Sequence, residues 1–123
     1  MAGTFTVTGK ISLVNGEQKV TIREPGTDTF TQTGQGVHQP AWIVGTSEEA
    51  LTVGDISTLG RIYFKNLDST NYVDIGPDSG GSMVGCIRLK PGEEHWFRSK
   101  PGITWKGQAN TAACKVEVKI CED

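Results

Sequence analysis

The chain reads Ala113-Cys114-Lys115-Val116-Glu117-Val118-Lys119-Ile120-Cys121 over the stretch that decides its fold. Small or apolar side chains alternate there with charged ones, and a period of two is typical of a β-strand that turns one face to a core. The alternation predicts that Cys114, Val116, Val118 and Ile120 point inward. Cys121 falls on the opposite face from Cys114, so these two thiols cannot form a disulfide within the strand. Together with Cys86 they are expected to be free, since the chain is expected to fold in a reducing compartment.

The same alternation recurs in short segments along the rest of the chain. We expect further strands over residues 4–13, 19–23, 41–44, 61–65, 72–75, 83–90, 94–99 and 103–107. Turn residues separate these segments roughly every ten residues, a spacing typical of sandwiches and small barrels. No connection is long and periodic enough for a crossover helix, which excludes parallel topology. The sequence therefore predicts an all-β fold: a small antiparallel β-sandwich, jelly-roll-like, with eight or nine short strands.

Three connections carry local predictions. Ser47-Glu48-Glu49 has the composition that starts one short helical turn. Asn66-Leu67-Asp68-Ser69-Thr70-Asn71 should close a turn between two core strands, because Asn and Asp side chains bond their own backbone. Gly76-Pro77-Asp78-Ser79-Gly80-Gly81-Ser82 is expected to be an irregular loop.

The segment before residue 27 predicts a hairpin that belongs to the sandwich. Within residues 4–13 one face carries apolar side chains, which we expect to point inward: Phe5, Val7, Ile11 and Leu13. Asn15-Gly16 favours a short turn because both residues tolerate positive φ. The return strand would then place Val20 and Ile22 inward as well.

Residues 27–41 are the least regular part of the chain. They contain several Thr, Gln and Gly residues, with Phe30 and Val37 as apolar anchors. We interpret this segment as a long loop or weak edge strand, and as an extended arm that could become ordered on a neighbouring chain.

Length and charge limit the class of protein. The 123 residues fit one domain, which we assign to residues 1–123. The net charge of −2 lacks the basic excess of nucleic-acid-binding proteins, so no nucleic-acid partner is expected. No segment approaches the roughly 18 apolar residues that cross a bilayer, and the first residues lack the regions of a signal peptide. We therefore expect no membrane partner and folding in a cytoplasm.

The sequence presents no pattern of a catalytic, cofactor or metal site. Residues 76–82 are rich in Gly but lack the Lys-Ser/Thr pair of a phosphate-binding loop. His38 and His95 lie far apart and outside any cluster with metal-ligand spacing. There is no nucleophile elbow and no His-Glu-x-x-His motif. We predict a non-enzymatic protein without cofactor or metal.

Side chains that fall out of phase with the core predict an interaction surface instead. Trp96 precedes Phe97 on one strand, so the two side chains point to opposite sides. Tyr63 is likewise out of phase with its neighbours. The predicted interface residues are Trp96, Tyr63, Phe30, Val37 and Trp42. Subunit interfaces are rich in Trp, but tryptophans on a β-sandwich can also form a sugar-binding platform, and the residues leave both interpretations open.

Several runs of strand and turn residues carry a resemblance. They include Arg61-Ile62-Tyr63-Phe64-Lys65-Asn66-Leu67-Asp68-Ser69-Thr70-Asn71-Tyr72-Val73, Leu89-Lys90-Pro91-Gly92-Glu93 and Asn110-Thr111-Ala112-Ala113-Cys114. Together with residues 45–51 and 54–60 they resemble a group of short virion-associated proteins of tailed bacteriophages. The resemblance covers about residues 42–123, whereas residues 1–41 look variable. Arg61 departs from the family pattern, which is more often purely apolar and aromatic over 61–64.

The resemblance implies a phage particle protein located in the virion, assembled in the cytoplasm of a host bacterium. The expected function is that of a capsid decoration or cement protein, and no catalytic residue is carried over. A small domain supplies only roughly 800 Å² to one contact, so we expect self-association, as a homotrimer, together with binding to the major capsid protein. A head–tail or tail component is the alternative within this class. A carbohydrate-binding module for surface attachment is the alternative outside it.

Overall fold

The computed structural model describes residues 3–123, and this part of the chain contains strands, turns and loops but no helix. The strands are β1 (Gly3–Thr8), β2 (Ile11–Asn15), β3 (Gln18–Arg23), β4 (Thr27–Gln32), β5 (Val37–His38), β6 (Ala41–Val44), β7 (Glu49–Ala50), β8 (Leu59–Asn66), β9 (Val73–Ser79), β10 (Ser82–Met83), β11 (Ile87–Leu89), β12 (Glu94–Arg98), β13 (Trp105–Ala109) and β14 (Cys114–Glu122). Every recorded pairing between them is antiparallel. The all-β, antiparallel prediction is confirmed, with fourteen strands in the described residues rather than eight or nine.

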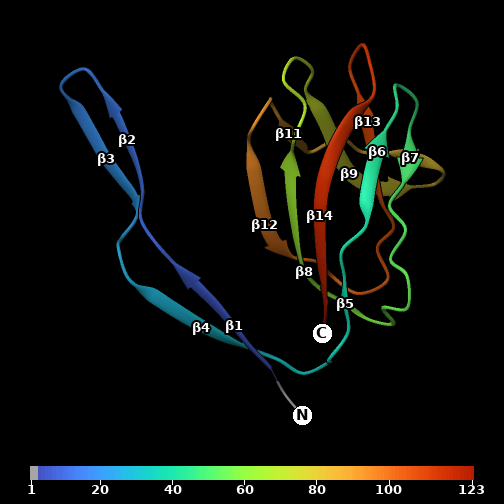
Figure 1. Ribbon diagram of the computed structural model, residues 1–123, viewed down its shortest axis with the longest axis horizontal. Helices are drawn as coiled ribbons and strands as arrows, with labels where there is room; N and C mark the ends of the chain where they lie inside the picture. The colour runs from blue at the N-terminus through green and yellow to red at the C-terminus, as the bar shows by residue number, and fades with distance from the viewer. Residues whose placement is uncertain (1–2) are drawn as a thin grey trace.

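Two five-stranded sheets form the body of the molecule (Figure 1). The first sheet has the order β12-β8-β14-β5, with β6 also paired to β14. The second has the order β10-β9-β13-β7, with β11 also paired to β9. Their apolar inner faces pack together in a core that includes Ile62, Phe64, Val73, Ile75, Ala109, Val116, Val118 and Ile120. The predicted β-sandwich is therefore confirmed.

Strand β14 lies at the centre of the first sheet and has the predicted register. Cys114, Val116, Val118 and Ile120 are buried, whereas Lys115 and Lys119 are exposed. Val118 lies opposite Phe64 and Ile120 opposite Ile62 on β8. These apolar cross-strand pairs are the unit by which an antiparallel sheet is stabilised.

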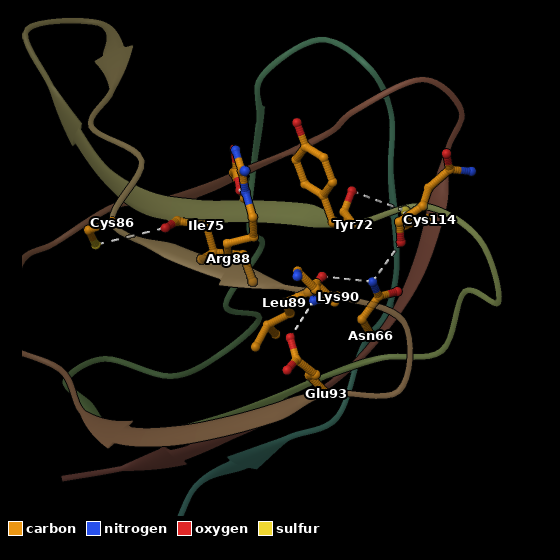
Figure 2. Close-up of polar contacts among 11 residues, drawn as sticks. Asn66, Tyr72, Ile75, Cys86, Arg88, Leu89, Lys90, Glu93 and Cys114 are labelled. Carbon is orange, nitrogen blue, oxygen red and sulfur yellow. Dashed lines mark hydrogen bonds and ion pairs between the residues drawn. The ribbon is translucent and has the colours of Figure 1, made fainter. Parts of the chain in front are cut away.

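Asn66, at the end of β8, joins two turns of the chain (Figure 2). Its side chain is buried and donates hydrogen bonds of 2.9 Å from Nδ2 to the carbonyl oxygens of Asn71 and Leu89. Its Oδ1 accepts a bond of 2.9 Å from the Asp68 amide. Its backbone accepts from the Gly92 amide and donates to the Glu93 carbonyl. The predicted turn over residues 66–71 is thus held by the Asn and Asp side chains, and Asn66 also holds the turn that follows β11.

Residues 76–82 do not form the irregular loop predicted from their composition. β9 continues through Gly76 and Pro77 to Ser79, and then turns back into β10 at Gly80 and Gly81. Pairing with β13 extends this strand, since Lys106 lies opposite Gly76 and Trp105 opposite Pro77. Tertiary pairing has overridden weak local propensity.

Two further local predictions are wrong. Residues 47–49 form no helical turn, because Glu49 and Ala50 instead pair with β13 as β7. The strand expected over residues 83–90 is divided into β10 and β11, with residues 84–86 outside both. Both differences lie at the edge of a sheet, where pairing with a neighbouring strand decides which residues adopt strand structure.

The largest correction concerns the first third of the chain. Residues 4–13 are two strands rather than one, since β1 ends at Thr8 and β2 begins at Ile11. β1 pairs with β4, and β2 pairs with β3, so the segment is a long two-stranded arm outside both sheets. Figure 1 shows the arm leaving the sandwich at β1 and β4 and then bending, with β2 and β3 standing apart from the body. We call β1 with β4 the proximal ribbon, and β2 with β3 the distal ribbon.

Candidate interaction surface

The proximal ribbon has two chemically different faces. In its register Phe5 lies opposite Phe30, and Val7 opposite Asp28. The other face consists of three cross-strand pairs of exposed threonines: Thr4 with Thr31, Thr6 with Thr29, and Thr8 with Thr27. β-branched side chains favour extended backbone and pair well across strands. The threonines therefore explain why residues 27–32, which we expected to be a loop or weak strand, form a regular ladder.

Aromatic side chains attach the proximal ribbon to the sandwich through Arg61. The Arg61 guanidinium carbon lies 4.3 Å from the ring centroid of Phe30, 5.0 Å from that of Phe5 and 5.6 Å from that of Trp96. The rings of Phe5 and Trp96 are 5.8 Å apart. Burial, and then the nearby Arg98 guanidinium, lower the pKa of Arg61 from its ordinary value. Arg61 thus forms the cation–π contacts that hold the arm's base.

A joint separates the two ribbons at the same level on both strands. Gly9 and Gly26 have φ angles of 121° and 150°, which other residues rarely adopt, and the Gly9 amide donates to the Gly26 carbonyl at 3.2 Å. Arg23 spans this joint: its guanidinium donates to the carbonyl oxygens of Gly9, Val7 and Glu24. The same group forms a 3.0 Å ion pair with Asp28. These bonds fix the bend between the ribbons.

The distal ribbon carries an exposed apolar surface that the sequence analysis did not predict. Its turn has Gly16 and Glu17 at the centre, with Gly16 at φ 60°, one residue later than the predicted Asn15-Gly16 pair. Every residue from 8 to 22 is exposed. Val20 and Ile22, expected in the core, are 51% and 66% exposed, and Ile11, Leu13 and Val14 are exposed as well. Leu13 lies opposite Val20, and Ile11 is two residues from Leu13, so these three share one apolar face.

The arm gives the chain more surface than its mass requires. The total accessible surface is 7527 Å². A compact monomer of 13.2 kDa would expose about 6,400 Å², which leaves an excess of about 1,100 Å². A standard protein interface covers about 800 Å² on each partner. The excess is therefore of the size that one subunit contributes to a stable assembly.

A mostly apolar groove lies on the outer face of the first sheet, beside the base of the arm. It has a volume of about 560 Å³, counting the space open to solvent, and is lined by Phe5, Arg61, Ile62, Tyr63, Trp96, Lys119 and Cys121. The Tyr63 hydroxyl donates to the Glu94 carboxylate at 2.8 Å, and burial followed by this bond raises the pKa of Tyr63 to about 12. Burial also raises the pKa of the Cys121 thiol. Both groups are neutral near pH 7, which suits an apolar contact.

The structure brings four of the five predicted interface residues to this region. Trp96 and Tyr63 lie opposite each other on β12 and β8, and Val37 lies opposite Cys121 on the same outer face. Phe30 reaches the edge of this face through Arg61. Trp42 is the correction: it is only 8% exposed and packs in the core against Phe64. Strand β6 turns Trp42 inward because Val44, two residues on, is also buried.

The outer face of the second sheet is polar and provides a contrast. Arg88 forms two bonds to Asp74, at 2.8 and 3.0 Å, and lies 4.0 Å from the Tyr72 ring. Lys106 pairs with Asp78 at 2.9 Å. These charged side chains keep the outer face of the second sheet polar, so the apolar contact surface of the sandwich belongs to the first sheet.

The distal ribbon was missed because its alternation is that of a half-buried strand. Gly9-Lys10 and Pro25-Gly26 interrupt the two strands at the same level, and this coincidence is the signal that could have revealed a jointed arm. The alternation predicts which side chains share a face of a strand, but it does not predict which other part of the structure packs against that face.

Within residues 3–123, no three His, Cys, Asp or Glu side chains are grouped so that they could hold a metal ion. The described part of the chain also has no helix that is long and apolar enough to cross a membrane. In comparisons with known proteins, no family model, curated protein or solved structure matches the chain.

Proposed function

We propose that this protein is a non-enzymatic structural protein of a tailed-phage virion, and that it decorates or cements the capsid shell. The observation that carries the proposal is the distal ribbon, which exposes Ile11, Leu13, Val14, Val20 and Ile22 outside any core. An isolated two-stranded hairpin is marginally stable in water at best. A ribbon of this kind gains stability when a partner protein covers its apolar face.

The division of the chain supports a particle role. The sequence resemblance to virion-associated phage proteins covers about residues 42–123, which are the strands of the sandwich from β6 onward. The segment before residue 42, which looks variable, contains the arm and the connection that carries β5. A constant body with a variable arm suits a protein that attaches to different shells through the arm. Its partners are other copies of itself, in a homotrimer, and the major capsid protein.

The alternatives differ in their support. A head–tail or tail component would use the same arm and remains the second assignment within the virion. A sugar-binding module would need Trp96 as an open platform, but that ring is 37% exposed and contacts Phe5 and Arg61. The groove is thus partly closed by the arm's own base, which favours a protein partner.

The test uses phage particles that are purified with and without the gene. We expect mass spectrometry to find the protein in a fixed ratio to the major capsid protein. A cryo-EM map of the virion should contain density for a sandwich with an arm on the outer shell, and this density should be missing from particles that lack the gene. Particles without the protein at any position would refute the proposal, and density at the neck or tail would select the second assignment.

A further inference from the structure

We infer that the distal ribbon of one copy docks in the groove on the first sheet of a second copy. The inference deepens the proposed function and rests on it only for the biological setting, because both surfaces are present on the chain itself. The occupant of the groove is the apolar face formed by Ile11, Leu13 and Val20.

The ribbon cannot satisfy this face within its own chain. β2 and β3 pair only with each other, and the residues that they contain are exposed up to Ile22. The joint at Gly9 and Gly26, fixed by Arg23, directs the distal ribbon away from the body (Figure 1). Cover must therefore come from another molecule.

The groove presents matching chemistry. Trp96 and the ring of Tyr63 provide apolar surface, and the Lys119 ammonium lies 5.8 Å from the Tyr63 ring centroid, at the groove's wall. A Leu and a Val side by side on a ribbon offer a flat apolar face of the kind that such a groove can accept. The excess surface of about 1,100 Å² exceeds the roughly 800 Å² that a standard interface takes from one partner.

The chain already shows this mode of contact at its own arm base. The proximal ribbon lies beside the same outer face, with Phe5 and Phe30 against Arg61 and Trp96. A second copy's distal ribbon would continue this contact across Tyr63 and Cys121, which line the groove and are half-buried. The two docking surfaces on one copy are different, so the contact can run head to tail from copy to copy, and such a heterologous contact forms a ring where its rotation closes. A trimer is one such ring.

Cross-linking of the full chain tests the contact directly. Cys121 lines the groove, and Leu13→Cys would place a second thiol on the ribbon's apolar face. Cys86→Ser removes the exposed thiol from each variant that is compared. With a short bismaleimide we expect covalent oligomers on a denaturing gel. Val14→Cys, on the ribbon's other face, is the matched control and should give several-fold less. Adding Cys121→Ser to Leu13→Cys should abolish the product.

Light scattering with a thermal melt provides the second measurement. Leu13→Asp with Val20→Asp should reduce the wild-type oligomer to monomer and leave the melt of the sandwich unchanged, because both side chains are outside the core. Val14→Asp should remain assembled. A wild type that is monomeric at high micromolar concentration, or an oligomer whose Leu13→Cys variant does not cross-link to Cys121, overturns the inference. In either case the proposed function stands if the protein is still found in virions, and falls only if it is absent from them.

Discussion

Replacing Asn66 by Ala should be among the most damaging single changes in the sandwich. The side chain makes three hydrogen bonds inside the protein, to Asn71, Leu89 and Asp68. Ala would leave two carbonyl oxygens and one amide without these partners at a fully buried position. The turn after β8 and the turn after β11 would lose their common anchor.

The size of the loss follows from the number of groups left unpaired. A buried polar group without a partner costs about 1–3 kcal/mol. The Leu89 bond is buried, whereas the Asn71 and Asp68 bonds are partly buried, so water can replace part of the latter two. We expect Asn66→Ala to lower the free energy of unfolding by about 3–5 kcal/mol, a large share of the 5–15 kcal/mol typical of a domain.

Urea unfolding followed by tryptophan fluorescence measures this loss. Asn110→Ala is the matched control, since Asn110 is exposed and the substitution keeps its backbone amide bond to the Tyr72 carbonyl; it should cost within about 0.5 kcal/mol. Asn66→Asp keeps the acceptor for Asp68 but removes both donors, so it should also be strongly destabilising near pH 7. A loss below about 1 kcal/mol for Asn66→Ala, the range of a single ordinary hydrogen bond, would refute the role of Asn66 as a common anchor.

Three further predictions concern the core, a close contact and pH. Ile120→Ala should lower the free energy of unfolding by about 2–5 kcal/mol, because it opens a cavity in the core. Lys119→Ala, on the exposed face, should change it by no more than about 0.5 kcal/mol. Equal losses for the two variants in urea unfolding would show that the register of β14 is wrong. Gly76→Ala should cost about 1–3 kcal/mol of unfolding free energy, because its Cβ would collide with the Val84 carbonyl oxygen. Gly85→Ala is the control, since its Cβ would meet only side-chain atoms of Met83 and Asp74, at 3.7 and 3.9 Å. A Gly76→Ala variant as stable as the wild type would contradict this geometry. Hydrogen bonds from the amides of Asn71 and then Thr70 lower the pKa of Asp68 below its ordinary 3.8, so the ionised carboxylate stabilises the fold above that value and this effect disappears as the pH falls through the lowered pKa. The stability difference between the wild type and Asp68→Asn should therefore be smaller in acid melts than at neutral pH. Melting temperatures of the two proteins that run parallel across pH would contradict the assignment.

The sandwich could be predicted from the sequence because its strands are covered by their own neighbours. In β14 the alternation of Val116, Val118 and Ile120 with charged residues matches the burial in the structure. The turn chemistry of Asn66 and Asp68 was also predictable, since both act on backbone within a few residues. The bond from Asn66 to Leu89 was not, because it joins residues 23 positions apart.

The arm could not be predicted, because a period of two shows which side chains share a face of a strand but not whether anything packs against that face. Val20 and Ile22 alternate with polar residues just as Val116 and Val118 do, yet the first pair is exposed and the second is buried. Trp96 and Tyr63 lie outside the core as their phase predicted, and the pairing of β12 with β8 places them opposite each other, whereas Trp42 is buried. Whether β6 turned Trp42 inward or outward depended on the register of its pairing with β14, in which Val116 lies opposite Trp42.

The structure also explains how an arm without a core can be ready to bind. Three features order it: the threonine pairs of the proximal ribbon, the glycine turn at residue 16, and the bonds of Arg23 across the joint. Each feature reduces the conformational freedom that would otherwise be lost on association, and this loss is a main cost of binding. The apolar side chains at the distal end are thereby presented on a shaped ribbon and not on a disordered tail. An arm built in this way can convert modest apolar burial into stable association with a partner.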